Sequence, residues 1–254
     1  MSKNLFFKSK DSKKDYFRWR IDRSREFISY LSKHITIKNK KILDFGCGQG
    51  ALSYILADYN DVFAVDSPNV IFQSKELCKD KNIKFIGQKS KRFPFEDDSF
   101  DIVLLFYILE HVDDLKNIIE EVKRVLKKDG YLCVEFPPYY SLIGHHLYRF
   151  TLLPMQYFPK KFVKWYLLRN EQNIKHEDTL EDTPITRASA WKTFKSLNKI
   201  TISKFRNLTK DMEMMNERFI FKYPGIFLIN IKPLKYIPLF RELLSFSYSA
   251  LLKK

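Results

Sequence analysis

The chain has 254 residues and a formal net charge of +15, from 45 Lys and Arg against 30 Asp and Glu, a balance that would attract phosphates, nucleic acid or anionic lipid. Hydrophobic residues make up 45% and charged residues 30% of the composition, which excludes wholesale disorder. At about 150 residues per domain, the length fits one large domain or one domain with an elaboration.

Five short apolar runs mark the first half of the chain. They are Ile42-Leu43, Val62–Val65, Ile83–Ile86, Ile102–Phe106 and Tyr131–Phe136. About 15 residues separate each of the first four runs, which is room for one helix and two turns. This alternation predicts repeated βα units and a parallel sheet covered on both faces. The near-continuous fourth run is typical of a central strand.

A helix is expected from about Asp114 to Lys128. Asp113 or Asp114 can cap its start, and Gly130 can end it. The apolar residues keep the 3,4 spacing of one buried face. They are Leu115, Ile118, Ile119, Val122, Val125 and Leu126.

The rhythm changes after Phe136. No acidic residue occurs from there to Asn170, and nine aromatic residues fall between Tyr139 and Tyr166. Aromatic rings interleaved with Lys and Arg suit stacking on sugar rings, contact with diphosphate or seating at an anionic membrane surface. The alternative is that these rings form the segment's own core.

The remaining chain alternates polar and apolar stretches. NEQNIKHEDTLEDTP is typical of an exposed loop, and helix signals return near Thr201. A strand is expected over Glu217–Phe221, and SFSYSALLKK is expected to form a last, edge strand.

Long apolar stretches and paired cysteines do not occur in the sequence. The longest uninterrupted apolar run, Ile102 to Leu109, is too short to cross a bilayer, and the first residues have no stretch long enough for a secretory signal. Cys47, Cys78 and Cys133 form no CxxC pair, so neither a disulfide framework nor a metal site is expected. We therefore expect a cytoplasmic protein, in contact with the inner membrane face if the basic aromatic segments bind lipid.

Three of the seven glycines lie within five positions, in DFGCGQG after the first strand. Glycine is needed where the backbone takes φ > 0 or passes close to a ligand, and the N–H groups at the following helix start can face a polar group. Asp66 ends the second strand, where a carboxylate can accept both hydroxyl hydrogens of a ribose. The two features predict a nucleoside site. Gly46-x-Gly48-x-x-Ala51 also fits the loose dinucleotide fingerprint, which leaves an oxidoreductase as an alternative.

ILDFGCGQG, VFAVDSP, PFEDDSFDIV, FYILEHVDD and YLCVEFPP follow one another in the chain. In this order they resemble the motifs of class I S-adenosylmethionine-dependent methyltransferases, most closely the type 11, ubiquinone-biosynthesis-like group, over about Lys40 to Pro138. The resemblance implies an α/β, doubly wound, Rossmann-like seven-stranded sheet whose last strand is antiparallel, with a helical, aromatic-rich lid inserted after the fifth strand. The corresponding division is an N-terminal helical segment over the site (1–38), a core (39–137 and 197–254) and a substrate lid (138–196).

The resemblance implies S-adenosyl-L-methionine as the cofactor and a set of residues that hold it. Where the group often has an acidic residue after the third strand, this chain has Gln88, which could still accept a hydrogen bond from the adenine amine. Leu105 and Phe106 would border the cofactor, or form core of the fourth strand. The full expected set is Asp44, Gly46, Cys47, Gly48 and Gly50 at the methionine part, Asp66 at the ribose, Ser67 and Gln88 at the adenine, and Leu105 and Phe106.

A hydroxyl acceptor needs a base, because it attacks poorly while protonated. The candidates are His111 after the fourth strand and His145 or His146 after the fifth, with Glu110 and Glu135 as weaker alternatives. His34 and His176 are interpreted as structural, and Arg20 and Arg23 as a solvated helix face more readily than as a cover of the site.

The acceptor predicted from the lid is a sugar, a glycan or a lipid-linked intermediate, methylated on oxygen in preference to nitrogen. The alternatives are an RNA methyltransferase, because the charge of +15 favours any polyanion, and a non-catalytic module that binds membrane or nucleic acid and keeps a nucleoside pocket. The oligomeric state is not predicted.

Overall fold

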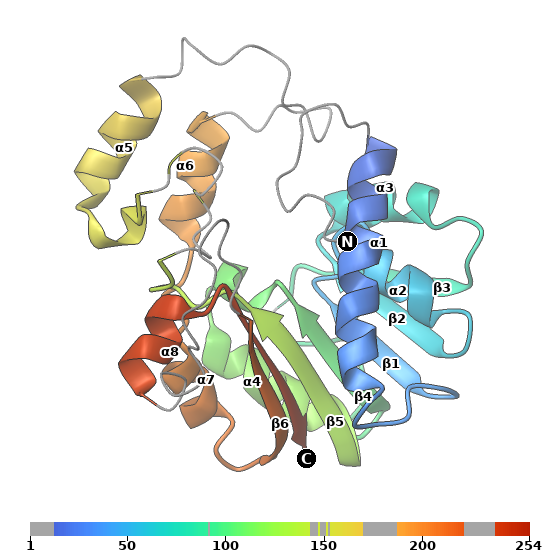
Figure 1. Cartoon of the computed structure of the whole chain (residues 1–254). Coiled ribbons are helices and arrows are strands. Elements are labelled where there is room, and N and C mark those ends of the chain that lie inside the picture. Colours follow the sequence, from blue (N-terminus) through green and yellow to red (C-terminus); the bar gives the residue numbers. More distant parts are fainter. Residues whose placement is uncertain are drawn as a thin grey trace, which may run out of the picture.

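A seven-stranded sheet of order β3-β2-β1-β4-β5-β7-β6 lies at the centre of the molecule (Figure 1). The structure is a computed structural model, and it describes residues 13–90, 92–142, 147, 151, 153–169, 187–220 and 237–254. β1 to β5 are parallel, whereas β7 pairs antiparallel with both β5 and β6. The predicted fold class, with its antiparallel last strand, is therefore confirmed.

The strands are β1 Lys41–Phe45, β2 Asp61–Asp66, β3 Ile83–Gly87, β4 Phe100–Phe106, β5 Leu126–Phe136, β6 Glu213–Ile220 and β7 Ser247–Lys253. The helices are α1 Lys13–Leu31, α2 Ala51–Leu56, α3 Pro68–Leu77, α4 Leu115–Val125, α5 Lys160–Arg169, α6 Arg187–Ser196, α7 Ile202–Leu208 and α8 Pro238–Leu244, with short 3-10 helices η1 Leu109–His111 and η2 Met155–Tyr157. Among the described residues, no helix is both long and apolar enough to cross a membrane.

Helices cover both faces of the sheet because alternate strand residues point to opposite sides. One core cluster joins strand residues such as Leu43 and Val103 to the apolar face of α4 and to α7. A second cluster joins Ile42 and Ile102, the strand neighbours of Leu43 and Val103, to α1 and α2 on the opposite face. The carboxyl ends of the parallel strands thus form one edge of a three-layer core.

The α4 helix has the predicted buried face, but its carboxyl end differs from the prediction. The Asp114 side chain accepts a hydrogen bond from the Asn117 N–H at 3.1 Å and caps the helix. The helix ends at Val125, and Leu126 already pairs with β4. A bulge follows, in which Asp129 has a φ of 64°. The chain therefore turns directly from the helix into β5, before Gly130.

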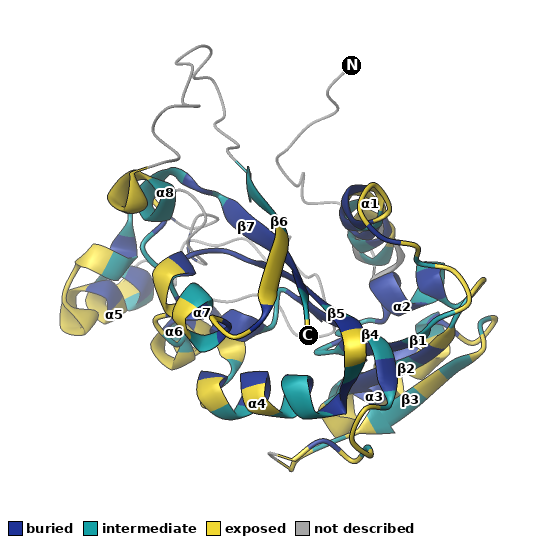
Figure 2. Cartoon of the chain, turned by 90° about the horizontal axis from the view of Figure 1, so that it is seen from below, coloured by how far each residue is buried: buried dark blue, intermediate teal, exposed yellow. Residues whose placement is uncertain are grey.

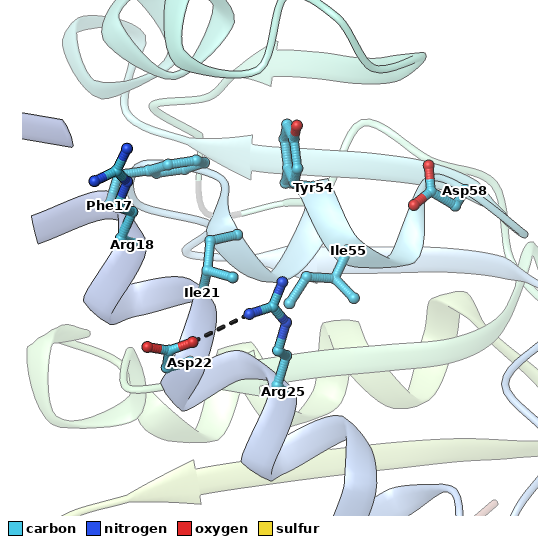
Figure 3. Close-up of a pocket in the computed structure, with 8 residues that line it drawn as sticks. All are labelled: Phe17, Arg18, Ile21, Asp22, Arg25, Tyr54, Ile55 and Asp58. Atoms are coloured by element: carbon cyan, nitrogen blue, oxygen red, sulfur yellow. Dashed lines mark hydrogen bonds and ion pairs between the residues drawn. The ribbon is translucent and has the colours of Figure 1, made fainter. Parts of the chain in front are cut away.

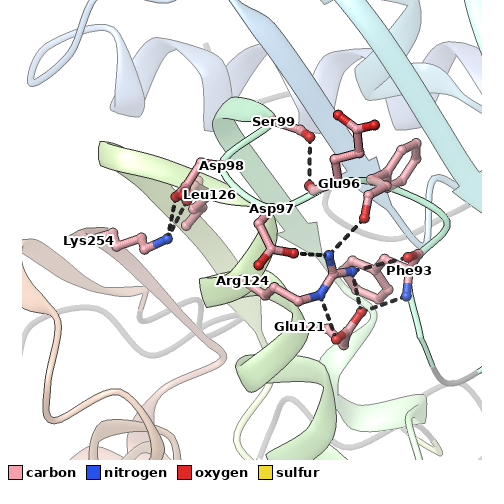
Figure 4. Close-up of polar contacts among 10 residues, drawn as sticks. Phe93, Glu96, Asp97, Asp98, Ser99, Glu121, Arg124, Leu126 and Lys254 are labelled. Carbon is pink, nitrogen blue, oxygen red and sulfur yellow. Dashed lines mark hydrogen bonds and ion pairs between the residues drawn. The ribbon is translucent and has the colours of Figure 1, made fainter.

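The connection between β3 and β4 also differs from the prediction, because the described part of residues 88–99 contains no helix. Arg124 of α4 holds this loop instead (Figure 4). Its guanidinium donates to the carbonyls of Phe93 and Phe95 at 3.1 and 2.8 Å and pairs with Asp97 at 2.7 Å. Glu121 completes the anchor by accepting from the Phe93 N–H at 2.7 Å and from Arg124 at 2.8 Å.

The tail strand was predicted as an edge strand, and the structure corrects this. β7 is buried along Ser247–Leu252 and lies between β5 and β6, so that β6 forms the edge. The helix predicted near Thr201 is present as α7, capped by the Thr201 hydroxyl, which accepts from the Lys204 N–H at 3.0 Å.

The segment after β5 builds a small unit of its own beyond the carboxyl ends of β4 and β5 (Figure 1). Val163 and Leu167 of α5 pack against Phe194 of α6 in a separate apolar cluster. The outer surfaces of α5 and α8 are exposed (Figure 2). The predicted loop NEQNIKHEDTLEDTP lies outside the described residues.

Candidate functional site

The glycine loop after β1 is built from three residues with positive φ. The φ angles are 76° at Gly46, 54° at Gly48 and 81° at Gly50, in the left-handed region that residues with a Cβ rarely adopt. The Gly46 N–H donates to the carbonyl of Val65 at 2.8 Å, which holds the loop against the end of β2. A Cβ on Gly46 would lie 2.3 Å from the Ile108 side chain, so this glycine also admits a close approach of the loop after β4.

Asp66 is bound to this loop through its carboxylate. Oδ2 accepts from the Gly48 N–H at 2.9 Å and Oδ1 from the Ser67 N–H at 2.7 Å. A carboxylate has about four acceptor positions, so both oxygens keep capacity for further donors. A Cβ on Gly48 would meet no atom within 4 Å, so open space lies beside the loop. The structure thus brings together the two features on which the nucleoside site was predicted.

Asp44 is buried at the end of β1, with 1% of its surface exposed. Burial raises the pKa of its carboxyl to about 6, although the Ser53 hydroxyl, which donates at 2.6 Å, and the nearby charge of Arg20 oppose the shift. The carboxylate is therefore a buried acceptor whose charge is stabilised by cationic or hydrogen-bonding groups at this strand end. Cys47 packs with Ala64 and Ile71 instead, and burial raises the pKa of its thiol.

Gln88 lies directly after β3 and is fixed by its own loop. Its N–H donates to the carbonyl of Asp66 at 2.9 Å, and Nε2 donates to the carbonyls of Ser90 and Arg92 at 2.7 and 3.0 Å. Oε1 has no hydrogen-bond partner among the described residues. This oxygen is buried, so the Gln88 side chain would have to turn for it to accept from an adenine amine.

The structure favours core packing for the two residues expected at the end of β4. Leu105 has 0% exposure and belongs to the cluster that packs on α4. Phe106 has 3% exposure and stacks on Phe27 of α1 with ring centroids 4.7 Å apart. The Arg20 guanidinium lies 5.6 Å from the centre of the Phe106 ring.

A polar network joins the ends of β4 and β5 to α1, and sequence reasoning did not find it. The Tyr107 hydroxyl donates to Glu135 Oε1 at 2.9 Å, and Arg23 pairs with the same oxygen at 3.3 Å and donates to the Tyr107 hydroxyl. Arg218 of β6 and the Ser249 hydroxyl bind Glu135 Oε2 at 3.2 and 2.7 Å. The interpretation of Arg23 as a solvated residue was therefore wrong: its side chain is 15% exposed and inserted between α1 and the sheet.

Tyr107 has a φ of 59°, a conformation that costs about 1–3 kcal/mol for a bulky residue and persists only where the surrounding structure holds it. Its hydroxyl is held by Glu135, Ser247 and Arg23. The backbone turns sharply here, between β4 and η1, and places Glu110 and His111 beyond the strand end. The sequence singled out Arg23 and Glu135 separately, one as a helix residue and the other as a weaker candidate base, but gave no signal of their contact.

Glu110 and His111 differ in exposure although they are neighbours. Glu110 is 3% exposed, and burial raises the pKa of its carboxyl to about 8. The His111 side chain is 37% exposed, and its partial burial lowers the pKa of the imidazole below the usual 6.5. His111 is thus neutral at pH 7 and can accept a proton, whereas Glu110 holds one.

Of the four remaining histidines, His34 alone lies among the described residues. His145, His146 and His176 lie outside the described residues, and His34 is exposed in the turn after α1. A pocket of about 480 Å³ lies between α1 and α2, lined by Phe17, Ile21, Tyr54 and Ile55 and by charged side chains that include the Arg25–Asp22 ion pair (Figure 3). This pocket contains none of the residues predicted from the sequence.

Comparison with known proteins gives matches over the part of the chain that contains the glycine loop and the strands around it. A family model described as a methyltransferase domain matches residues 43–134. An uncharacterized protein of Methanocaldococcus jannaschii is 37% identical over 128 residues, 48% of this chain and 52% of that protein. The ubiquinone biosynthesis O-methyltransferase of Coxiella burnetii is 32% identical over 137 residues, 50% of this chain and 58% of the relative. The chain spans about half the length of these curated relatives.

Several solved structures share the fold of this chain over nearly its whole length, at low sequence identity. The PH0226 protein of Pyrococcus horikoshii superposes with a TM-score of 0.55 at 22% identity, over 91% of this chain and 90% of that one. An S-adenosylmethionine-dependent methyltransferase of Methanosarcina mazei gives a TM-score of 0.54 at 20% identity, over 89% and 96%. This family and fold imply S-adenosylmethionine as the cofactor. Residues 43–134 of the chain therefore match the methyltransferase domain of the type 11 family, and the similar proteins include an O-methyltransferase and an S-adenosylmethionine-dependent methyltransferase.

Proposed function

We propose that this protein is an enzyme that transfers the methyl group of S-adenosylmethionine to an oxygen atom of a sugar, a glycan or a lipid-linked intermediate. The observation that carries the proposal is the contact between the Asp66 carboxylate and the Gly48 N–H at 2.9 Å, beside open space at Gly48. An acidic strand end bound to a glycine turn is the arrangement that binds a ribose in nucleotide-binding α/β folds.

The described residues fit the adenosyl group. Asp66 would accept the ribose hydroxyl hydrogens and Gln88 Oε1 the adenine amine, with Ser67 beside the ring. Asp44 and the backbone of Gly46, Gly48 and Gly50 would hold the methionine part. When bound, the cofactor supplies an electrophilic methyl group on a positively charged sulfur. The chain's own task is to align the acceptor with that methyl group and to exclude water.

The acceptor proton would be taken up by a histidine at the carboxyl ends of β4 and β5. His111 is held in η1 and is neutral at pH 7 because its pKa is lowered, so it is a competent base. His145 and His146 remain candidates from their place in the sequence after β5. Glu110 is a poorer base at pH 7 because its carboxyl, with a pKa of about 8, holds its proton.

The histidines are tested by comparing turnover of His111→Ala, His145→Ala and His146→Ala at saturating cofactor. Loss of a general base lowers kcat by about 100-fold or more, and the wild-type rate should rise with pH through a midpoint below 6.5 if His111 is the base. His34→Ala, in the exposed turn after α1, is the matched control. A loss of only a few-fold in all three variants would contradict the assignment.

The acceptor class is supported by the segment that follows β5. The chain from Phe136 to Asn170 has no acidic residue and carries basic and aromatic side chains that suit sugars, diphosphate or an anionic membrane surface. This segment, 138–196, would act as the substrate lid, and α1 as a cover from the other side. A lipid-linked acceptor would place the enzyme at the inner membrane face.

The substrate is tested by uptake of radiolabelled methyl groups from S-adenosylmethionine. Nucleotide sugars, lipid-linked glycans, polyprenyl-phenol quinone precursors and bulk RNA are offered separately, with Asp66→Ala as the variant deficient in cofactor binding. The proposal expects labelling of a glycan or lipid-linked fraction by the wild type only. Labelling of RNA alone would show a methyltransferase whose acceptor is RNA and not a glycan or lipid-linked molecule. No labelling of any fraction would count against both the activity and the acceptor.

A further inference from the structure

The α5 helix has two apolar faces, and only one is needed for its own packing. Val163 and Leu167 are fully buried against α6. On another face lie Phe162 and Trp165, which are 37% and 51% exposed, continued by Phe158 at 38% just before the helix. Positions 162 and 165 are three residues apart and share a helix face, and Phe158, just before the helix, continues the line through its contact with Phe162.

The exposed rings stack on one another. The centroids of Phe158 and Phe162 are 5.2 Å apart with planes at 29°, and those of Phe162 and Trp165 are 5.7 Å apart at 34°. The Arg169 guanidinium lies 5.0 Å from the centre of the Trp165 ring. The three rings therefore form one continuous, partly exposed apolar ridge.

Positive charge lies beside the ridge, and its Lys and Arg side chains form no ion pair within the part of the chain that the structure describes. Lys161, Lys164 and Arg169 line a shallow hollow together with Trp165 and Leu168. The nearest acidic residues in the sequence lie outside 136–170. A second exposed apolar element, α8, is on the same side of the molecule (Figures 1 and 2), with Leu239 63% and Phe240 37% exposed.

The chain also links α8 to the unit that carries α5. The Leu142 N–H donates to the carbonyl of Leu243 of α8 at 2.9 Å. Gln156 of η2 donates to the carbonyl of Ser141 at 2.6 Å. Both α8 and η2, the short helix that precedes α5, are therefore hydrogen-bonded to the same short segment, 141–142.

We propose that the exposed face of α5 is a docking surface for an anionic lipid bilayer. Phe158, Phe162 and Trp165 enter the headgroup region, and Lys161 and Lys164 bind lipid phosphates. Aromatic residues favour this interface, and each basic residue near an anionic leaflet adds electrostatic attraction. The inference rests on this surface alone and holds whether or not methyl transfer is the activity.

The test is flotation of the full chain with phosphatidylcholine vesicles that contain or lack phosphatidylglycerol, at low and high salt. The wild type should float with the anionic vesicles at low salt and much less with neutral ones. Lys164→Glu with Trp165→Ser should lower binding by about tenfold or more. The matched control is Lys75→Glu with Phe72→Ser on α3, where Phe72 is 80% exposed, and it should bind as the wild type does.

Two further readouts keep the test decisive. S-adenosylhomocysteine affinity, measured by calorimetry, should be unchanged in the α5 variant, which shows that the chain is folded and separates docking from cofactor binding. In a Trp19→Phe, Trp191→Phe background, the emission of Trp165 should shift to shorter wavelength on anionic vesicles. The proposal is overturned if the wild type ignores anionic vesicles, if both variants lose binding equally, or if single-stranded RNA displaces the vesicles and binds through the same residues.

Discussion

Glu110 and Tyr107 show how a single residue in this site depends on what surrounds it. Both follow β4, where the chain leaves the sheet, and both pack into protein instead of facing solvent at this edge. In the sequence they stand in FYILEHVDD as an ordinary aromatic and an ordinary acid. Their burial comes from α1 and from the segment after α6, whose Asn198 N–H donates to the Glu110 carbonyl at 3.1 Å. Such long-range burial has no local sequence signal.

Glu110 makes the stability of the chain depend on pH. Its pKa is raised from 4.5 to about 8 by burial, so the folded chain keeps a proton that the unfolded chain releases. The contribution of Glu110 to the free energy of unfolding is therefore fully present below pH 4.5. It decreases by up to about 1.4 kcal/mol per pH unit as the pH rises from 4.5, and it is lost once the pH has passed about 8.

Urea denaturation of Glu110→Gln measures this effect, because glutamine stays neutral throughout. Relative to the wild type, the variant should gain about 2–4 kcal/mol of unfolding free energy between pH 5 and pH 8. Glu120→Gln, on the exposed side of α4, controls for the loss of one negative charge. Parallel pH profiles of the wild type and Glu110→Gln would contradict the buried, protonated carboxyl.

Among the elements, the strands were predictable and the connections were less so. β1 to β5 coincide with the five apolar runs because buried parallel strands need near-continuous hydrophobic side chains. The expected helix between β3 and β4 is replaced by a loop that Arg124 fastens from about 30 residues away. The end of α4 and the interior position of β7 were likewise set by pairing with distant strands.

Arg124 should therefore be a stability residue of the loop over 92–99. Arg124→Ala removes hydrogen bonds to two carbonyls and two carboxylates, and should lower the free energy of unfolding by about 2–4 kcal/mol. Lys116→Ala on the same helix, which breaks only the exposed pair with Glu120, should cost less than about 0.5 kcal/mol. Chemical denaturation of both variants checks the difference, and equal losses would refute the anchoring role.

At the scale of the whole molecule, the candidate functional residues lie along one edge of the sheet. The glycine loop, Asp66, Gln88, Glu110 and the Arg23–Glu135 network all lie where the parallel strands end, as expected for α/β folds that bind ligands at this edge. The loop and Asp66 were predictable because glycine spacing and strand ends are local. The network was not, because Arg23 and Glu135 are 112 residues apart.

The most direct measurement is calorimetric titration of S-adenosylhomocysteine and of NAD into the wild type, Asp66→Ala and Asp61→Ala. Asp61 begins the same strand, and its side chain pairs with Lys84 at the exposed end, so it is the matched control. The account predicts binding of S-adenosylhomocysteine and not NAD, weakened about 10- to 100-fold by Asp66→Ala and unchanged by Asp61→Ala. Equal affinity in the wild type and Asp66→Ala, or binding of NAD instead, would contradict it.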